Sequence, residues 1–343
     1  MLSLPTLQAD IVCNAKAAPA QVHLVVEQSL RQSWCDAGGG ALEVAPIIVV
    51  TDPVESQQQG QPIVCPGNFE GDTTSINGAT DSFNSGGRIE VNANAALLKQ
   101  GDNFVNARAS LLLGLNADST VDDAWIQFGN SSLDFKFGRF EAVDLFPVAK
   151  DTVLVTPTLD DDGKTGVGYR ANTLRGRFKD GQFHGALGFN AAPGLRFELG
   201  LMKHKADDKE QSGVRPAVTY TTGDLTLRAG LESFDKGAGN QTGYGLSAGY
   251  ALSKEAAVNV NYAKSSDLDS SSVGANLVYG PAGIGYIQDK TGANKLDTVY
   301  AAYSFPLLGV KGAFITPAIS VSSGNNDRLA DTTAFRVRLN YAF

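Results

Sequence analysis

The feature that most constrains this chain is the two-residue alternation of its last stretch, residues 333–343. Side chains of an extended strand point alternately to opposite faces, so this stretch has one wholly apolar face and one basic and polar face. The apolar face carries Phe335, Val337, Leu339, Tyr341 and Phe343, and the other carries Arg336, Arg338, Asn340 and Ala342. Such a strand separates an apolar phase from water. The edge of a soluble β-sandwich is the alternative.

The same alternation recurs along residues 88–343. Arg88, Glu90 and Asn92 alternate with Ile89, Val91 and Ala93, for example. A soluble barrel filled by its own core is too small to use so many residues. The pattern therefore predicts an all-β fold, a transmembrane antiparallel β-barrel whose apolar side meets lipid and whose polar side meets a wet lumen. Further polar rows contain Asn106, Arg108 and Ser110; Gln127; Asp134 and Lys136; Arg175 and Arg177; Arg196 and Glu198; Thr226 and Arg228; Asn259 and Asn261.

Composition narrows the class further. No run of 18 apolar residues occurs among the 343 residues, so no transmembrane helix is expected. The mean hydropathy of -0.10 suits a barrel, in which only every second residue touches lipid. A net charge of -8 and a pI near 5.0 argue against a nucleic-acid partner.

Two kinds of connection separate the expected strands. Tight turns are expected at residues 130–132, 179–181, 192–194, 222–224, 253–255 and 280–283. Longer polar connections are expected at 205–213, 236–243, 265–272, 289–296 and 322–332. The segments number about 16, with 14 or 18 open and an even count required. Counted back from the C-terminus, residues 141–168 fall at the tight-turn end, which indicates a miscounted strand between residues 133 and 201.

A chain whose last strand ends on Phe343 resembles Gram-negative outer-membrane β-barrels, in which the terminal Phe is the mark read by the assembly machinery. Residues 134–141 (DFKFGRFE) are similar to the porin pattern in which a strand ending in Gly-Arg leads to a loop folded into the pore. Together with residues 125–130 (WIQFGN) and 141–147 (EAVDLFP), they resemble the glycoporin (raffinose porin-like) branch. The resemblance implies an outer-membrane porin for passive diffusion of small hydrophilic solutes, with carbohydrates favoured.

The resemblance also implies partners. Outer-membrane lipid and lipopolysaccharide would surround a homotrimer, sugars or ions would be the permeants, and no cofactor would be needed. A general diffusion porin and a plugged structural or adhesive barrel are the alternatives.

The expected site has two parts. Carboxylates on an inserted loop opposite wall arginines would put a transverse field across the pore. Trp125, joined by Phe140 or Phe146, would stack on sugar rings. The expected pore-lining residues are Arg88, Arg108, Trp125, Lys136, Arg139, Arg175, Arg177, Arg228, Arg336 and Arg338, and those of the constriction loop are Asp144, Lys150, Asp151, Asp160, Asp161 and Asp162. Asp160, Asp161 and Asp162 also suit a solvated turn, and they lack the ligand spacing of a calcium loop.

An N-terminal extension is expected over residues 1–86, at the periplasmic side or in the barrel mouth, with the barrel over residues 87–343. Residues 71–87 have the composition of a linker. Cys13, Cys35 and Cys65 are an odd number without metal-site spacing, so one disulfide between an undefined pair is expected. No signal peptide is visible, so the numbering is expected to be that of a mature or engineered chain.

An enzyme is the remaining class to test. A hydrolase embedded in a barrel needs a base beside its nucleophile, and the only histidines are His23, His184 and His204. No serine lies in a Gly-x-Ser-x-Gly motif. The sequence therefore predicts neither an enzyme nor a metal site.

Overall fold

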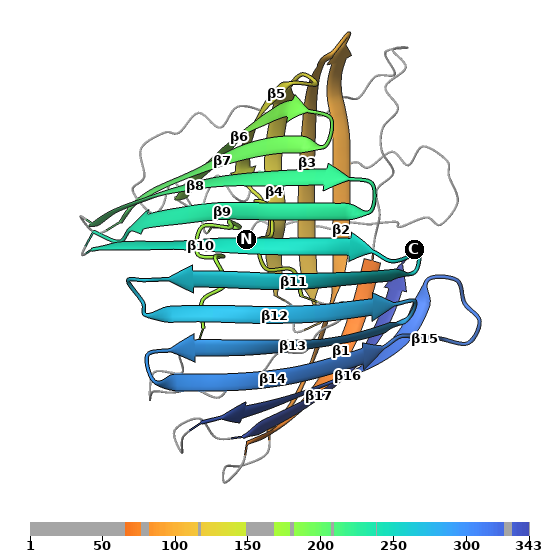
Figure 1. Ribbon diagram of the computed structural model, residues 1–343. Coiled ribbons are helices and arrows are strands. Elements are labelled where there is room, and N and C mark those ends of the chain that lie inside the picture. Colours follow the sequence, from red (N-terminus) through yellow and green to blue (C-terminus); the bar gives the residue numbers. More distant parts are fainter. Residues whose placement is uncertain are drawn as a thin grey trace, which may run out of the picture.

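The computed structural model of this chain describes residues 66–76, 82–115, 118–148, 168–178, 182–206, 209–237, 239–325 and 331–342. They form one closed antiparallel sheet (Figure 1). Among these residues no helix is long and apolar enough to cross a bilayer. The strands are β1 (Pro66–Ile76), β2 (Ser82–Gln100), β3 (Asn103–Gly114), β4 (Ser119–Gly129), β5 (Leu133–Arg139), β6 (Gln182–Ala192), β7 (Leu195–Ala206), β8 (Lys209–Thr222), β9 (Leu225–Asp235), β10 (Asn240–Ala251), β11 (Ala256–Ser265), β12 (Ser270–Tyr279), β13 (Ala282–Thr291), β14 (Asn294–Tyr303), β15 (Phe305–Pro306), β16 (Ala313–Gly324) and β17 (Thr332–Ala342).

The sheet closes between its first and last strands. β1 pairs with β17 from Pro66 opposite Ala342 to Ile76 opposite Thr332, and its other edge pairs with β2. Apart from the two-residue β15, the barrel has 16 strands, each hydrogen-bonded to its neighbours in sequence. The expected fold class and strand number are confirmed. Closure pairs the first strand with the last, so neither is left as a free edge in the bilayer.

Burial is inverted relative to a soluble protein. Large apolar side chains such as Phe128, Leu246 and Val299 are exposed on the outside, whereas Asn261, Asp289 and Thr298 are buried on the inside. In β17, Phe335 and Leu339 point outward, and Arg336 and Arg338 share the inward row with buried Thr332 and Ala334. The apolar faces therefore meet the bilayer and the polar faces meet the lumen, as expected.

Three details differ from the expectation. The barrel begins at Pro66, so residues 66–86, expected in the extension and its linker, supply β1 and the start of β2. Their alternation is masked by Ser, Thr, Asn and Gly, which occur in linkers and in lumen-facing rows alike. Residues 174–178 are not a strand, and this is the suspected miscount. The strands also continue into the expected long connections, so only residues 207–208 separate β7 from β8 and 292–293 separate β13 from β14.

One connection dominates the end opposite the tight turns. It runs from β5 to β6, and its described residues 140–148 and 168–178 are called the insert from here on. The insert contacts inward-facing wall residues of β8–β13, so it lies inside the barrel. In Figure 1 its yellow-green trace crosses the interior behind the front strands. The end that carries the tight turns, Pro66 and Ala342 is called the short-turn end.

Candidate functional site: the insert and the barrel wall

A buried ion pair on β8 and β9 holds the insert. Arg215 is 1% exposed, and its Nη2 donates to the carbonyl oxygens of Val143 at 2.9 Å and Ala171 at 3.2 Å. Its Nε lies 3.7 Å from Oε2 of Glu232. This one guanidinium ties both halves of the insert to the wall.

Glu232 binds the second half of the insert, residues 168–178. It accepts hydrogen bonds from the backbone N–H groups of Thr173 at 3.2 Å and Leu174 at 3.1 Å, and from the hydroxyl of Tyr169. Burial and the Glu232 charge raise the pKa of Tyr169 well above its ordinary value. The phenol therefore stays protonated and remains a donor to the carboxylate.

Glycines in the wall make room for apolar side chains of the insert. A Cβ on Gly230 would lie 2.6 Å from Cδ1 of Leu145, and a Cβ on Gly245 would lie 2.9 Å from Cβ of Leu145. A Cβ on Gly274 would lie 2.9 Å from Phe146. Leu145 and Phe146 are 1% and 4% exposed, and each stabilises the docked insert by roughly 2 kcal/mol through burial.

A third anchor lies on β12 and β13. Asp289 is fully buried, forms an ion pair with Nη2 of Arg170 at 2.8 Å and accepts the hydroxyl hydrogen of Ser272. The Tyr169 N–H donates to Oγ of Ser272 at 3.0 Å. At Gly168, φ is +87° and the Asp289 side chain fills the place of a Cβ, so this position requires glycine. All three anchors lie on β8–β13, opposite the part of the wall that β14–β4 form.

A chain of alternating charges begins on that opposite wall at a β-bulge in β4. Ala109 pairs with Ala124 and Leu111 with Val121, so Asp122 and Asp123 share the space opposite Ser110. Both carboxylates are buried. Oδ2 of Asp123 lies 3.2 Å from Nε of Arg108, and its Oδ1 lies 3.2 Å from Nε of Arg177.

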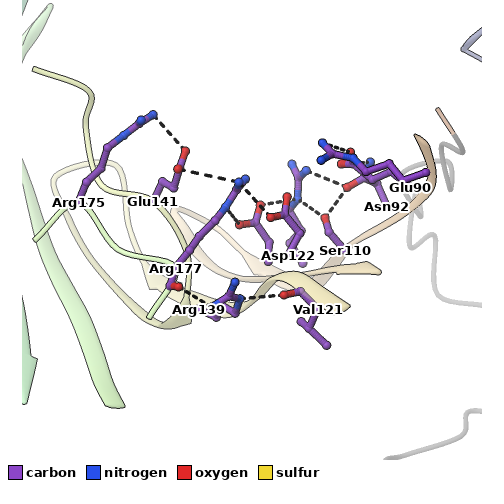
Figure 2. Close-up of polar contacts among 12 residues, drawn as sticks. Glu90, Asn92, Ser110, Val121, Asp122, Arg139, Glu141, Arg175 and Arg177 are labelled. Atoms are coloured by element: carbon purple, nitrogen blue, oxygen red, sulfur yellow. Dashed lines mark hydrogen bonds and ion pairs between the residues drawn. The ribbon is translucent and has the colours of Figure 1, made fainter. Parts of the chain in front are cut away.

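The chain of charges continues onto the insert (Figure 2). Nη1 of Arg177 is 3.0 Å from Asp122 and 3.9 Å from Glu141. Arg175 then lies 3.0 Å from Glu141 and 3.6 Å from Asp144. At the other end, Arg108 donates to Asn92 at 2.9 Å, Asn92 donates to Glu90 at 2.9 Å, and Glu90 is 3.6 Å from Arg88. We call this series the charge ladder: Arg88, Glu90, Asn92, Arg108, Asp122, Asp123, Arg177, Glu141, Arg175 and Asp144.

Arg177 occupies an unusual backbone conformation within the ladder. Its φ is +58°, which costs a non-glycine residue about 1 kcal/mol. Its N–H donates to the Phe140 carbonyl at 2.8 Å, and its own carbonyl accepts from Nη1 of Arg139. Contacts to its backbone and to its side chain hold the strained conformation.

The expected arginines fall into different places. Arg108, Arg175 and Arg177 belong to the ladder with Asp144. Arg228 lies on the inward row of β9 opposite Thr219 and Ser247. Arg336 and Arg338 lie on the inward row of β17, opposite Ala318 and Thr316.

Arg139 departs from the expected lumenal position. It lies opposite Ala124 on the row that Phe137 and Ile126 share, and this row points outward. Its Nε donates to the Val121 carbonyl at 2.8 Å, and its Nη1 donates to the carbonyls of Phe178 at 2.6 Å and Arg177. It therefore satisfies backbone at a strand end and does not line the pore.

Trp125 and Lys136 lie together on the inward face. Nζ of Lys136 is 4.7 Å from the centre of a Trp125 ring and 5.3 Å from that of Phe140. Phe140 and Phe146 are only 2% and 4% exposed, so the expectation that either joins Trp125 along the path is wrong. Phe140 and Phe146 instead pack the insert against the barrel wall. Five of the six expected residues of the constriction loop lie outside the described residues: Lys150, Asp151, Asp160, Asp161 and Asp162.

Sequence reasoning missed the anchors. Arg215 and Glu232 belong to polar rows like many others. The insert residues that they bind lie 44 to 72 positions away from Arg215 and 58 to 63 positions away from Glu232. One signal was available at Asp122 and Asp123, because two adjacent carboxylates break an alternating row and mark a bulge.

Comparison with known proteins agrees with this architecture. Residues 65–186 match the family described as porin-like glycoporin RafY. No curated protein matches. Among solved structures, a loop-deletion mutant of OmpT, an outer membrane protein of Vibrio cholerae, is 15% identical with a TM-score of 0.55, over 82% of this chain and 99% of that one. A mutant of the Rh. blastica porin is 14% identical with a TM-score of 0.54, over 82% of this chain and 100% of that one.

A further structure, OmpT of Vibrio cholerae folded in vitro and described as the trimer form, is 14% identical with a TM-score of 0.55, over 82% of this chain and 99% of that one. The fold of these proteins is that of this chain. Residues 65–186 are therefore similar to the porin-like glycoporins, and the barrel has the fold of the outer-membrane porins.

Proposed function

We propose that this chain is an outer-membrane porin that lets small hydrophilic solutes, above all carbohydrates, diffuse passively through a homotrimer surrounded by outer-membrane lipid and lipopolysaccharide. The observation that carries the proposal is the anchored insert, which narrows the lumen, together with the charge ladder that runs from β2–β4 onto the insert. The family match to glycoporins and the trimer form of OmpT support the choice of sugar and of assembly.

The charges of the narrowed region support polar permeants. Glu141 and Asp144 lie on the insert, and Arg336 and Arg338 lie on the inward row of β17, in the part of the wall that the anchors leave open. Opposed charges across a wet lumen order water, which favours solutes that replace water hydrogen bonds and disfavours apolar ones.

Two further features favour sugars. Trp125 offers a ring on the lumenal side, and ring faces suit the CH groups of a pyranose. A recess of about 690 Å³ opens between Val143 of the insert and the wall toward the short-turn end. It is lined by Asn190, Arg196, Glu198, Thr219 and Thr221, which can both donate to and accept from sugar hydroxyls.

Liposome swelling with a graded series of mono- to tetrasaccharides tests the proposal. We expect sugars of equal mass to enter at different rates. Trp125→Ala should reduce that difference while leaving potassium chloride conductance in place, and Phe128→Ala, an outward change on the same strand, should alter neither. A smooth fall of rate with mass would favour a general diffusion porin, and absence of swelling would indicate a plugged barrel.

A further inference from the structure

We propose that Arg228 is a binding subsite for the anionic group of a sugar that carries a carboxylate or a phosphate. The inference rests on the proposed function and narrows it, because it names a charged class of carbohydrate and the residue that selects this class. Three observations carry it: the unpaired guanidinium of Arg228, the uncharged wall around it, and the hydroxyl-lined recess beside it.

Arg228 differs from the other arginines of the described residues. Each of the others has a hydrogen bond, an ion pair or another electrostatic contact, as Arg196 has with Asp134 at 2.6 Å. Within the described part of the chain, the guanidinium of Arg228 has neither a hydrogen bond nor an ion pair, and the side chain is half-buried. A guanidinium presents five N–H donors in a planar fork, which fits the oxygens of a carboxylate or a phosphate. Arg228 therefore has its full donor set available to a solute.

The register of β9 places Arg228 in the lumen, directly on the short-turn side of the insert. It lies two residues before Gly230, and a Cβ on Gly230 would lie 2.6 Å from Cδ1 of Leu145 in the insert. Two residues of a strand tilted by about 40° span about 5 Å along the barrel axis. A solute that passes the insert toward the short-turn end therefore comes within reach of Arg228.

The wall around Arg228 offers no competing carboxylate. Between the insert and the short turns, the inward rows of β8–β11 carry one charged side chain among the described residues, and it is Arg228. The inward carboxylates of β5 and β7, Asp134 and Glu198, lie near the cations Lys136 and Arg196, which offset their charge. An anion at Arg228 therefore meets one uncompensated positive charge.

Hydroxyl groups beside Arg228 supply the contacts that a sugar ring needs. Thr219 lies opposite Arg228, and Thr221 lies opposite Thr226 with their Oγ1 atoms 3.4 Å apart. Thr219 and Thr221 also line the recess of about 690 Å³ between the insert and the wall. Small-molecule sites typically have volumes of roughly 300 to 1,000 Å³. Because hydroxyl groups both donate and accept, the recess can hold the ring while Arg228 binds the anionic group at its edge.

A subsite at this place changes how long a solute stays in the lumen. A sugar bound at Arg228 lies between the insert and the short-turn end, so it obstructs the potassium chloride current until it leaves. A neutral sugar lacks the attraction between opposite charges and leaves sooner. Binding is therefore visible as block of the current, and the half-blocking concentration measures its strength.

Block of potassium chloride current through wild-type channels in planar bilayers tests the subsite. The probes are glucuronate, glucose 6-phosphate and neutral glucose, added at pH 7 and constant ionic strength. We expect at least one anionic sugar to block at a concentration about tenfold below that of glucose, the factor that one hydrogen bond to a charged group supplies. The two anionic probes tell whether a carboxylate or a phosphate is the group that binds.

Two variants assign the block to Arg228. Arg228→Met should abolish the advantage of the anionic sugar, and Arg228→Lys should lose part of it because an ammonium does not bind an oxyanion bidentately. Lys254→Met is the matched control, since it removes an exposed cation from the short turn between β10 and β11 and should keep the advantage. An advantage that is absent from the wild type, or that survives in Arg228→Met, would overturn the subsite. If Arg228→Met fails to fold, the full advantage in Arg228→Lys would overturn it instead.

Failure of the subsite and failure of the proposed function give different results. If neutral sugars swell liposomes while neither anionic sugar blocks better than glucose, the channel passes carbohydrates and only the subsite is removed. If no sugar causes swelling, the passage of carbohydrates is contradicted whatever the block shows.

Discussion

Arg215 and Glu232 form an ion pair that water hardly reaches, with side chains 1% and 2% exposed. Removing one partner of a buried pair leaves an uncompensated charge, which typically costs about 3 to 5 kcal/mol. Much of this loss would weaken the docking of the insert, because Arg215 also binds two carbonyls of the insert. We expect Arg215→Met to release the insert and to give larger and noisier single-channel conductance.

The control for this prediction is a solvent-exposed ion pair between a lysine and a glutamate. Lys203 and Glu210 lie 2.7 Å apart with side chains 64% and 55% exposed, so Lys203→Met should leave conductance unchanged. Arg215→Met combined with Glu232→Leu should recover part of the lost stability, because both charges are then absent. Steady, wild-type conductance in Arg215→Met would show that the pair does not hold the insert.

Gly245 provides a steric test of the same docking. A Cβ at this position would lie 2.8 Å from Cβ of Ala171 and 2.9 Å from Cβ of Leu145, so both halves of the insert must move. Overpacking of this kind costs roughly 1 to 3 kcal/mol. We expect Gly245→Ala to make the β5–β6 connection more sensitive to protease in folded protein.

Gly86→Ala is the matched control, because a Cβ there meets nothing within 4 Å. The readout is the rate of cleavage within residues 140–181, measured by mass spectrometry. Equal rates in the two variants would mean that the wall glycines are not needed to seat the insert.

The fold was largely predictable because a barrel wall has a local code. In each strand, one residue of every consecutive pair faces the lumen and the other faces the outside, as Arg338 and Leu339 do in β17. The code fails at Thr73 and Thr74 in β1, since small polar residues occur in linkers as well as in strands. It also fails at Arg175 and Arg177, which alternate with apolar neighbours in a segment that is not a strand.

The site was less predictable because its contacts join distant residues. Asp289 meets Arg170 across 119 positions, and no local pattern records that distance. Charge and parity predict a lumenal position for Arg108, but they do not reveal that Asp123 binds it. Arg139 shows the converse, since its charge suggests the lumen while its register places it outside.

Ion selectivity tests the acidic end of the charge ladder. Glu141 and Asp144 both contact Arg175 at the edge of the lumen. Neutralising them leaves Arg175 without its partners, so the local field becomes more positive. A unit charge about 8 Å from an ion in water changes its energy by about 0.5 kcal/mol, or about twofold in permeability for each charge. We expect Glu141→Gln with Asp144→Asn to shift the reversal potential toward that of chloride in a potassium chloride gradient.

Salt dependence separates this effect from a structural one. The shift should shrink as ionic strength rises, because the Debye length falls from about 10 Å at 0.1 M to about 3 Å at 1 M. Glu210→Gln removes an exposed charge beyond the narrowed region and should leave the reversal potential unchanged. A shift that persists at 1 M salt, or that moves toward potassium, would contradict the assigned position of these carboxylates.

Stability tests the contacts of Arg139. Its guanidinium satisfies the carbonyls of Val121, Arg177 and Phe178, and hydrogen bonds to a charged group contribute about 1.5 to 3 kcal/mol each. We expect Arg139→Met to lower the free energy of unfolding by at least about 3 kcal/mol, measured from urea titrations of the folded and unfolded gel bands.

Arg139→Lys should recover little of this stability, because a single ammonium cannot span carbonyls on both β4 and the insert. Arg228→Met is the control, since Arg228 makes no ion pair with any residue that the structure describes, and its loss should cost under about 1 kcal/mol. Equal stability of Arg139→Met and Arg228→Met would mean that water satisfies the carbonyls of Val121, Arg177 and Phe178 without Arg139.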